Sequence, residues 1–175
     1  DPETRETGEE NMLGDDLFGV HMRYLAKANA AQGEPTYLYH FTRVPPSSKQ
    51  TLGAFHASEI FFVFNSHSPL SGLTDEDKIL TEAMATYWTN FARTGDPNSA
   101  GLVEWPLYDP ASDLWMTFNP SIEIKSGVRS DKLDVMERAL EDRIVTAYPI
   151  INSKPDPTVS TSSGGQQITA DRFEP

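Results

Sequence analysis

A long amphipathic pattern in the middle of the chain constrains the fold more than any other feature. Between residues 79 and 92 the apolar positions follow alternating steps of one and three, which places them on one wide stripe of a helix. Thr74 and the acids at 75–77 indicate the start of this helix, and Gly95 indicates its end. The stripe favours core packing over ligand binding, and it needs a partner surface. Its members are Ile79, Leu80, Ala83, Met84, Tyr87, Trp88, Phe91 and Ala92.

A second helix is predicted near the start of the chain. Either Asp15 or Asp16 can cap it, and Gly33 ends it after about Gln32. Helical spacing places four positions near one face, as in an amphipathic helix: Phe18, Met22, Leu25 and Ala28 or Asn29.

The remaining elements are shorter or follow later in the chain. Residues 36–42 predict a strand that is apolar nearly throughout, as in the centre of a covered sheet. Further strands are predicted at 114–118 and 122–125, and a last helix from Asp131 to about Tyr148. We expect residues 1–154 to be part of one domain, followed by an extended tail at 155–175, which is rich in Ser, Thr and Gly.

This order of elements predicts an α/β layered fold. Two or three strands make a poor independent sheet, and the wide helical stripe also lacks a cover. Both observations predict that more sheet exists elsewhere. A free-standing domain of 175 residues is therefore the least favoured interpretation.

Composition excludes several classes of function. The net charge of −12 would repel phosphate backbones and anionic membrane surfaces, so no nucleic acid or membrane partner is expected. With no cysteine, thiolate catalysis and disulfides are excluded, and no apolar stretch is long enough to span a membrane. The start of the sequence lacks an initiator methionine and a hydrophobic signal, which predicts an origin inside a longer product. The compartment stays open, with a secreted or periplasmic location favoured.

One histidine is a candidate for chemistry. His56 lies between small residues and the aromatic run 60–64, and a neutral imidazole there could be the general base for a serine nucleophile. The alternative is a structural histidine. His21, His40 and His67 are expected to be structural or solvated. The four histidines do not share metal-ligand spacing, so neither a metal nor a cofactor is expected.

Five segments, in this order, resemble the C-terminal third of the type-B carboxylesterases, the cholinesterase-like branch of the α/β-hydrolases. The likeness extends over about residues 14–143 and rests on the ordered combination rather than on any one piece. The segments are GDDLF at 14–18, GEPTYLYHF at 33–41, GAFHASE at 53–59, YWTNFARTGDPN at 87–98 and WPLY at 105–108.

The resemblance implies a carboxylic ester hydrolase with a Ser-His-Glu/Asp triad and an acyl-enzyme intermediate. It makes His56 the triad base and Glu59 a buried acid that supports the histidine loop. Ala57 departs from the glycine that the family often has, which is tolerable unless the backbone there needs a positive φ. Phe55 and Leu52 are the best candidates for a substrate pocket, whereas most of the other aromatic residues nearby are expected to pack in the core.

The nucleophile is missing from this sequence. No serine has the Gly-x-Ser-x-Gly context of a nucleophile elbow, because Ser99 and Ser163 have only the second glycine. The resemblance also puts the triad acid further upstream than the 55 residues before His56. The expected fold is therefore the C-terminal portion of an α/β-hydrolase, with its late strands, histidine loop and C-terminal helices. An N-terminal portion of the same fold is the expected partner, and a small-molecule ester the expected substrate.

One alternative to the enzyme remains open. Cholinesterase-like folds also serve as catalytically inactive binding or adhesion modules, which keep the scaffold and lose triad members. A histidine in the triad position argues against this alternative without excluding it.

Overall fold

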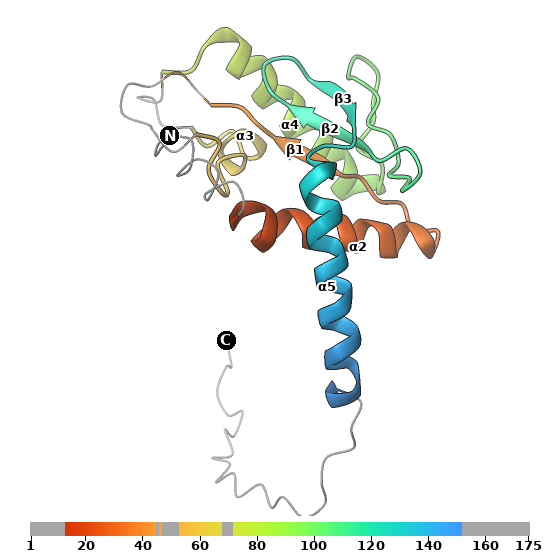
Figure 1. Cartoon of the computed structure of the whole chain (residues 1–175). Helices are drawn as coiled ribbons and strands as arrows, with labels where there is room; N and C mark the ends of the chain where they lie inside the picture. Colours follow the sequence, from red (N-terminus) through yellow and green to blue (C-terminus); the bar gives the residue numbers. More distant parts are fainter. Residues whose placement is uncertain (1–12, 45, 47–52, 68–71, 152–175) are drawn as a thin grey trace, which may run out of the picture. The chain divides into compact units, whose positions relative to one another are not determined.

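The computed structural model describes residues 13–44, 46, 53–67 and 72–151, and Figure 1 shows the elements that they form. The chain divides into two compact units, Asp1–Leu140 and Glu141–Pro175. The tail that the sequence predicts at 155–175 lies outside the described residues, so the division at residue 154 stays a prediction. Within the described ranges, no helix combines the length and apolarity that crossing a membrane requires.

The strands form one small mixed sheet in the order β1-β2-β3. β1 (Tyr39–Phe41) runs parallel to β2 (Leu114–Phe118), and β3 (Glu123–Ser126) runs antiparallel to β2. The sequence prediction is confirmed for 114–118 and is one residue early for β3. The strand predicted at 36–42 is shorter, and β1 lies at an edge of this sheet rather than in its centre. Among the described residues, no strand pairs with the side of β1 that faces away from β2.

Helix α4 (Asp75–Thr94) has the predicted ends. The Thr74 hydroxyl accepts from the backbone N–H of Asp77, whose carboxylate accepts in return from the N–H of Thr74. Gly95 ends the helix with a left-handed φ of 78°, which glycine adopts without strain. The fully buried Asp77 also binds the guanidinium of Arg43 just after β1, with Nε 2.5 Å from Oδ1.

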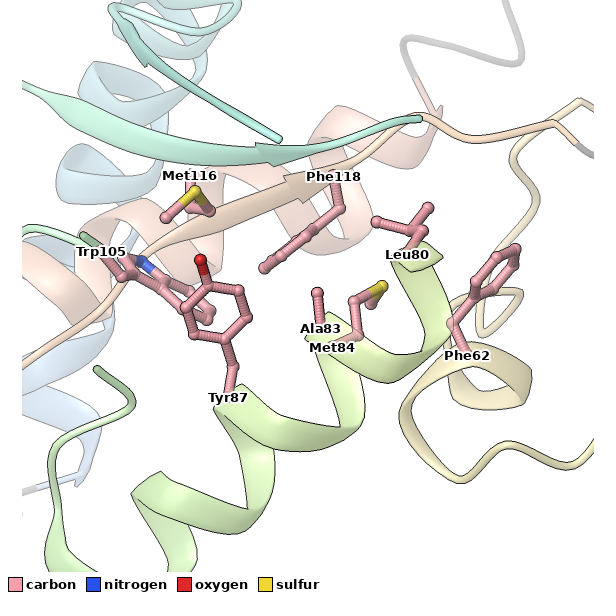
Figure 2. Packing of buried hydrophobic residues seen from close by; sticks show 8 residues of the cluster. All are labelled: Phe62, Leu80, Ala83, Met84, Tyr87, Trp105, Met116 and Phe118. Atoms are coloured by element: carbon pink, nitrogen blue, oxygen red, sulfur yellow. The ribbon is translucent and has the colours of Figure 1, made fainter. Parts of the chain in front are cut away.

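The core on one side of the sheet is largely aromatic. The central residues of the α4 stripe point toward β2, and α3 (Ile60–Val63) adds Phe62 at the helix start (Figure 2). Ile79 and Phe91, however, are 65% and 48% exposed, so the described residues leave the flanks of the predicted stripe largely uncovered. The buried members of this cluster are Phe62, Leu80, Ala83, Met84, Tyr87, Trp105, Met116 and Phe118.

Two asparagines connect the end of α4 to this core. The Asn90 side chain donates to the carbonyl of Pro97 at 3.1 Å. Asn98 accepts from the backbone N–H of Trp105 at 2.7 Å and donates to its carbonyl at 3.0 Å. The indole of Trp105 in turn donates to the carbonyl of Leu38, one residue before β1. The motif at 87–98 therefore has a structural explanation.

The first helical segment and the last helix pack on the other side of the sheet. A π-helix, η1 (Asp15–Gly19), continues into α2 (Val20–Ala31), and α5 extends over Ser130–Ile151. Alternation along β2 puts Trp115 on the side opposite Met116. The buried members of this second cluster are Val20, Ala26, Leu38, Tyr108, Trp115, Leu133 and Leu140.

The apolar face that the sequence predicts for the first helix is not the face that packs. Phe18, Met22 and Leu25 are 42%, 50% and 53% exposed. The face that packs instead carries Val20 and the charged Arg23, because acids of α5 lie opposite it. Asp15 is not a cap either: residues 13 and 14 are already helical, and its carboxylate binds Arg129.

Arg23 is the centre of a buried ion network. It is 6% exposed, and its guanidinium lies 3.1 Å from Asp113, 2.6 Å from Asp134 and 3.5 Å from Glu137. Asp113, the residue before β2, also accepts from the Tyr108 hydroxyl and the Trp115 indole. One cation thus joins α2, β2 and α5.

Loss of this cation should destabilise the fold. We expect Arg23→Met to lower the free energy of unfolding by about 3–5 kcal/mol, because the carboxylate of Asp113 would stay buried without its cation, whereas Glu137 keeps Lys27 at 2.7 Å. Lys78→Met is the matched control: its pair with Asp75 is exposed, so a change within about 0.5 kcal/mol is expected. Chemical denaturation measures both, and equal losses would contradict the role given to Arg23.

Candidate functional site

His56 lies in a tight turn between β1 and α3. The N–H of Ser58 donates to the carbonyl of Phe55 at 3.0 Å, and the N–H of Ile60 donates to that of Ala57 at 3.2 Å. These bonds fold the backbone on both sides of the histidine, and its side chain is exposed. The backbone of His56 is therefore fixed while its imidazole faces outward, as a residue that transfers protons requires.

The turn depends on a left-handed backbone at Ala57. Its φ is 69°, a region that costs a residue with a Cβ about 1–2 kcal/mol. Sequence analysis identified a positive φ as the one condition under which alanine would be unfavourable here, and the φ of Ala57 is positive. The strain stays local, next to the candidate base.

Glu59 connects the turn to the sheet. Its carboxylate lies close enough to the Tyr39 hydroxyl on β1 to affect the pKa of that tyrosine. Burial and the adjacent Glu59 charge raise the pKa of Tyr39 to about 12. The Tyr39 ring packs edge-on against Trp88, with centroids 5.2 Å apart, so the acid has a rigid partner. Sequence reasoning missed Tyr39, which it treated only as part of an apolar strand.

A second aromatic contact involves His56 itself. The Phe18 ring stacks on the imidazole, with centroids 4.2 Å apart and an angle of 10° between the planes. The sequence placed Phe18 on the apolar face of the first helix. Thirty-eight positions separate the two residues, and no local pattern connects them.

Ser58 does not have the position of a nucleophile. It is only 6% exposed, and its hydroxyl has no hydrogen-bond partner among the described residues. No substrate carbonyl could reach an oxygen that is buried in this way. The absence of a nucleophile elbow from the sequence therefore agrees with the geometry of this turn.

Two other histidines, His40 and His67, have their own surroundings. His40 is half-buried on β1, where burial and then the Arg129 charge lower its pKa. His67 lies 3.1 Å from the Thr81 hydroxyl and edge-on to Phe62, and burial lowers its pKa. Among the described residues, no group of three or more acids and histidines could hold a metal ion.

The pocket candidates have mixed outcomes. Phe55 is 36% exposed next to His56, whereas Leu52 lies outside the described residues. Phe62 is buried as expected, but Phe61 and Phe64 are 45% and 73% exposed, so core packing is wrong for these two. Helix α3 has only one turn, and only one of its faces meets α4.

Comparison with known proteins gives a consistent result. The model of the carboxylesterase family matches residues 1–136. Carboxylesterase 5A of Canis lupus familiaris is 34% identical over 134 residues, which are 71% of this chain and 23% of that protein. The medium-chain fatty acyl-CoA hydrolase precursor of Anas platyrhynchos is 39% identical over 138 residues, or 75% and 25%. The chain thus spans about a quarter of the length of these relatives.

A solved structure is also similar. A thermophilic PNB esterase aligns with a TM-score of 0.52 and 30% identity, over 59% of this chain and 22% of that one.

The left-handed backbone at residue 57 predicts a stabilising substitution. Ala57→Gly should raise the free energy of unfolding by about 0.5–1 kcal/mol, because relief of the strain exceeds the added entropy of the unfolded glycine. Ala85→Gly, within α4, is the matched control and should lower it by about 1 kcal/mol. Thermal denaturation distinguishes the two signs, and a destabilised Ala57→Gly protein would contradict the account of this turn.

The Tyr39 hydroxyl predicts a dependence of stability on high pH. Its folded pKa is raised from 10.0 to about 12, so the stability it adds is complete below pH 10 and is lost as pH rises to about 12. The difference in free energy of unfolding between wild type and Tyr39→Phe should be constant below pH 10 and then shrink. Denaturation series across this range measure it, and a constant difference up to pH 12 would contradict the prediction.

Proposed function

The chain belongs to the carboxylesterase family, and on that premise we propose that it forms the C-terminal part of a carboxylic ester hydrolase with His56 as its catalytic base. Its fold is that of part of an α/β-hydrolase. The observation that carries the proposal is the exposed imidazole on a strained turn, three residues before an acid that lies beside the half-buried Tyr39.

The mechanism assigns one proton path to His56. The imidazole takes the proton of a serine hydroxyl as the oxygen attacks the ester carbonyl, and then gives it to the departing alcohol. Water then attacks the acyl-enzyme, with His56 taking its proton and returning it to the serine oxygen, and the carboxylic acid is released. Glu59 acts on the turn that holds His56, and Phe55 and Leu52 are proposed to line the substrate pocket.

The serine, the triad acid and the oxyanion donors are proposed to belong to an N-terminal portion of the same fold. The free edge of β1 could accept a further strand from it. Four exposed apolar residues of the first helical segment offer it a second surface: Leu13, Leu17, Met22 and Leu25. The small-molecule ester then binds between the two portions, and its identity depends on residues of both.

Substitution of the base tests the proposal. In the hydrolase that contains both portions, His56→Gln should reduce turnover of a p-nitrophenyl ester by about 10³-fold or more, because a glutamine cannot accept the proton. His21→Gln, the same change at an exposed histidine of α2, should keep turnover. Circular dichroism checks that both variants fold. Normal turnover in His56→Gln would refute the assignment.

A fluorophosphonate probe tests the nucleophile separately. Labelling of a serine in the intact protein, weakened by His56→Gln, is the expected result. No labelling of the wild-type protein would instead support the inactive adhesion module.

A further inference from the structure

We propose that Phe18 is a positioning residue for His56, and that its ring fixes the plane of the imidazole and stabilises the positive charge that it gains during turnover. This inference rests on the proposed function, because it gives Phe18 a role only through the catalytic base.

The geometry of the pair is that of a face-to-face stack. The ring planes differ by 10° and the centroids are 4.2 Å apart, close enough for contact over most of the imidazole face. A stacked partner covers only the face of the ring. Both nitrogens lie on its edge, so they stay available for a serine hydroxyl on one side and an acid on the other.

Core packing does not explain the position of Phe18. Its side chain is 42% exposed, and it belongs to neither buried cluster of the described chain. Large apolar side chains gain most of their stability from burial, and the described residues bury Phe18 only in part. Its contact with His56 is the interaction that distinguishes it from its exposed neighbours Leu17 and Met22.

The backbone that presents Phe18 is unusual. Residues 15–19 form a π-helix, a rare conformation that is frequent at functional sites. Asp15 anchors its start with a two-pronged bond to Arg129 at 2.6 and 2.5 Å. At its end, space is limited, because a Cβ at Gly19 would lie 3.1 Å from a methyl of Leu133. Phe18 lies between these two positions.

The chemistry gives the ring face a role in the transition state. The imidazole becomes a cation when it takes the serine proton, and the face of a phenyl ring attracts a cation. This attraction exists mainly after proton transfer, so it lowers the barrier more than it strengthens substrate binding. The stack also removes rotational freedom from the free imidazole before the reaction begins.

Steady-state kinetics of the hydrolase that contains both portions test the role. Phe18→Leu should reduce kcat roughly three- to thirtyfold with little change in KM, since it removes the ring but keeps an apolar side chain. Phe18→Tyr, which restores an aromatic face, should recover most of the loss. Phe64→Leu is the matched control, because Phe64 is an exposed phenylalanine at the end of α3, and its kcat should stay at the wild-type value.

Proton NMR of histidine-labelled protein tests the stack without activity. The side-chain protons of His56, assigned with His56→Gln, should be shifted upfield by the Phe18 ring current. The shift should disappear in Phe18→Leu and remain in Phe18→Tyr. Identical resonances in wild type and Phe18→Leu would overturn the inference.

The kinetic outcomes separate this inference from the proposed function. If His56→Gln abolishes turnover while Phe18→Leu keeps the wild-type kcat, only the role of Phe18 fails. An equal loss in Phe64→Leu, or no recovery in Phe18→Tyr, would also overturn it. If His56→Gln keeps its turnover, the proposed function fails and this inference fails with it.

Discussion

The buried guanidinium of Arg23 is the interaction on which the arrangement of helices around the sheet depends. It binds the acid that precedes β2 and two acids of α5, so one charge fixes α2 against both elements. A network of this kind gives little net stability compared with an apolar core, but it tolerates few other arrangements. The pair between Asp15 of η1 and Arg129, the residue before α5, adds a second link between the first helical segment and the start of α5. Together these pairs hold the π-helix that carries Phe18.

The histidine turn takes its rigidity from the opposite side of the sheet. Tyr39 lies among the aromatic rings that pack between β2 and α4, and its hydroxyl lies beside Glu59. The close-packed core therefore fixes the position of Tyr39, which lies beside the carboxylate of Glu59 in the histidine turn. Sites that are built on strands and helices keep their geometry better than sites on long loops.

Local signals predicted the elements whose limits are set locally. The capping box at Thr74, the glycine at 95 and the residues of β2 gave the correct ends of α4 and β2, because neighbouring residues fix those ends. The apolar face predicted for the first helix is not the face that packs, because amphipathicity identifies an apolar face but not the surface that covers it. Arg23 reversed the outcome by pairing with acids about 110 positions away.

The candidate site shows the same division. A short motif identified His56 and the condition on residue 57, since both depend on adjacent backbone. Tyr39 and Phe18 reach the turn only through the register of β1 and the widened turn of η1, neither of which leaves a trace in the spacing of residues. The resemblance named His56 as the candidate base, and the folded chain was needed to identify its neighbours.

The free edge of β1 also has a consequence for the behaviour of the chain in solution. An unpaired strand edge is a template onto which another polypeptide can add a strand, and among the described residues nothing pairs with this one. At high concentration, copies of the chain are therefore expected to associate through β1.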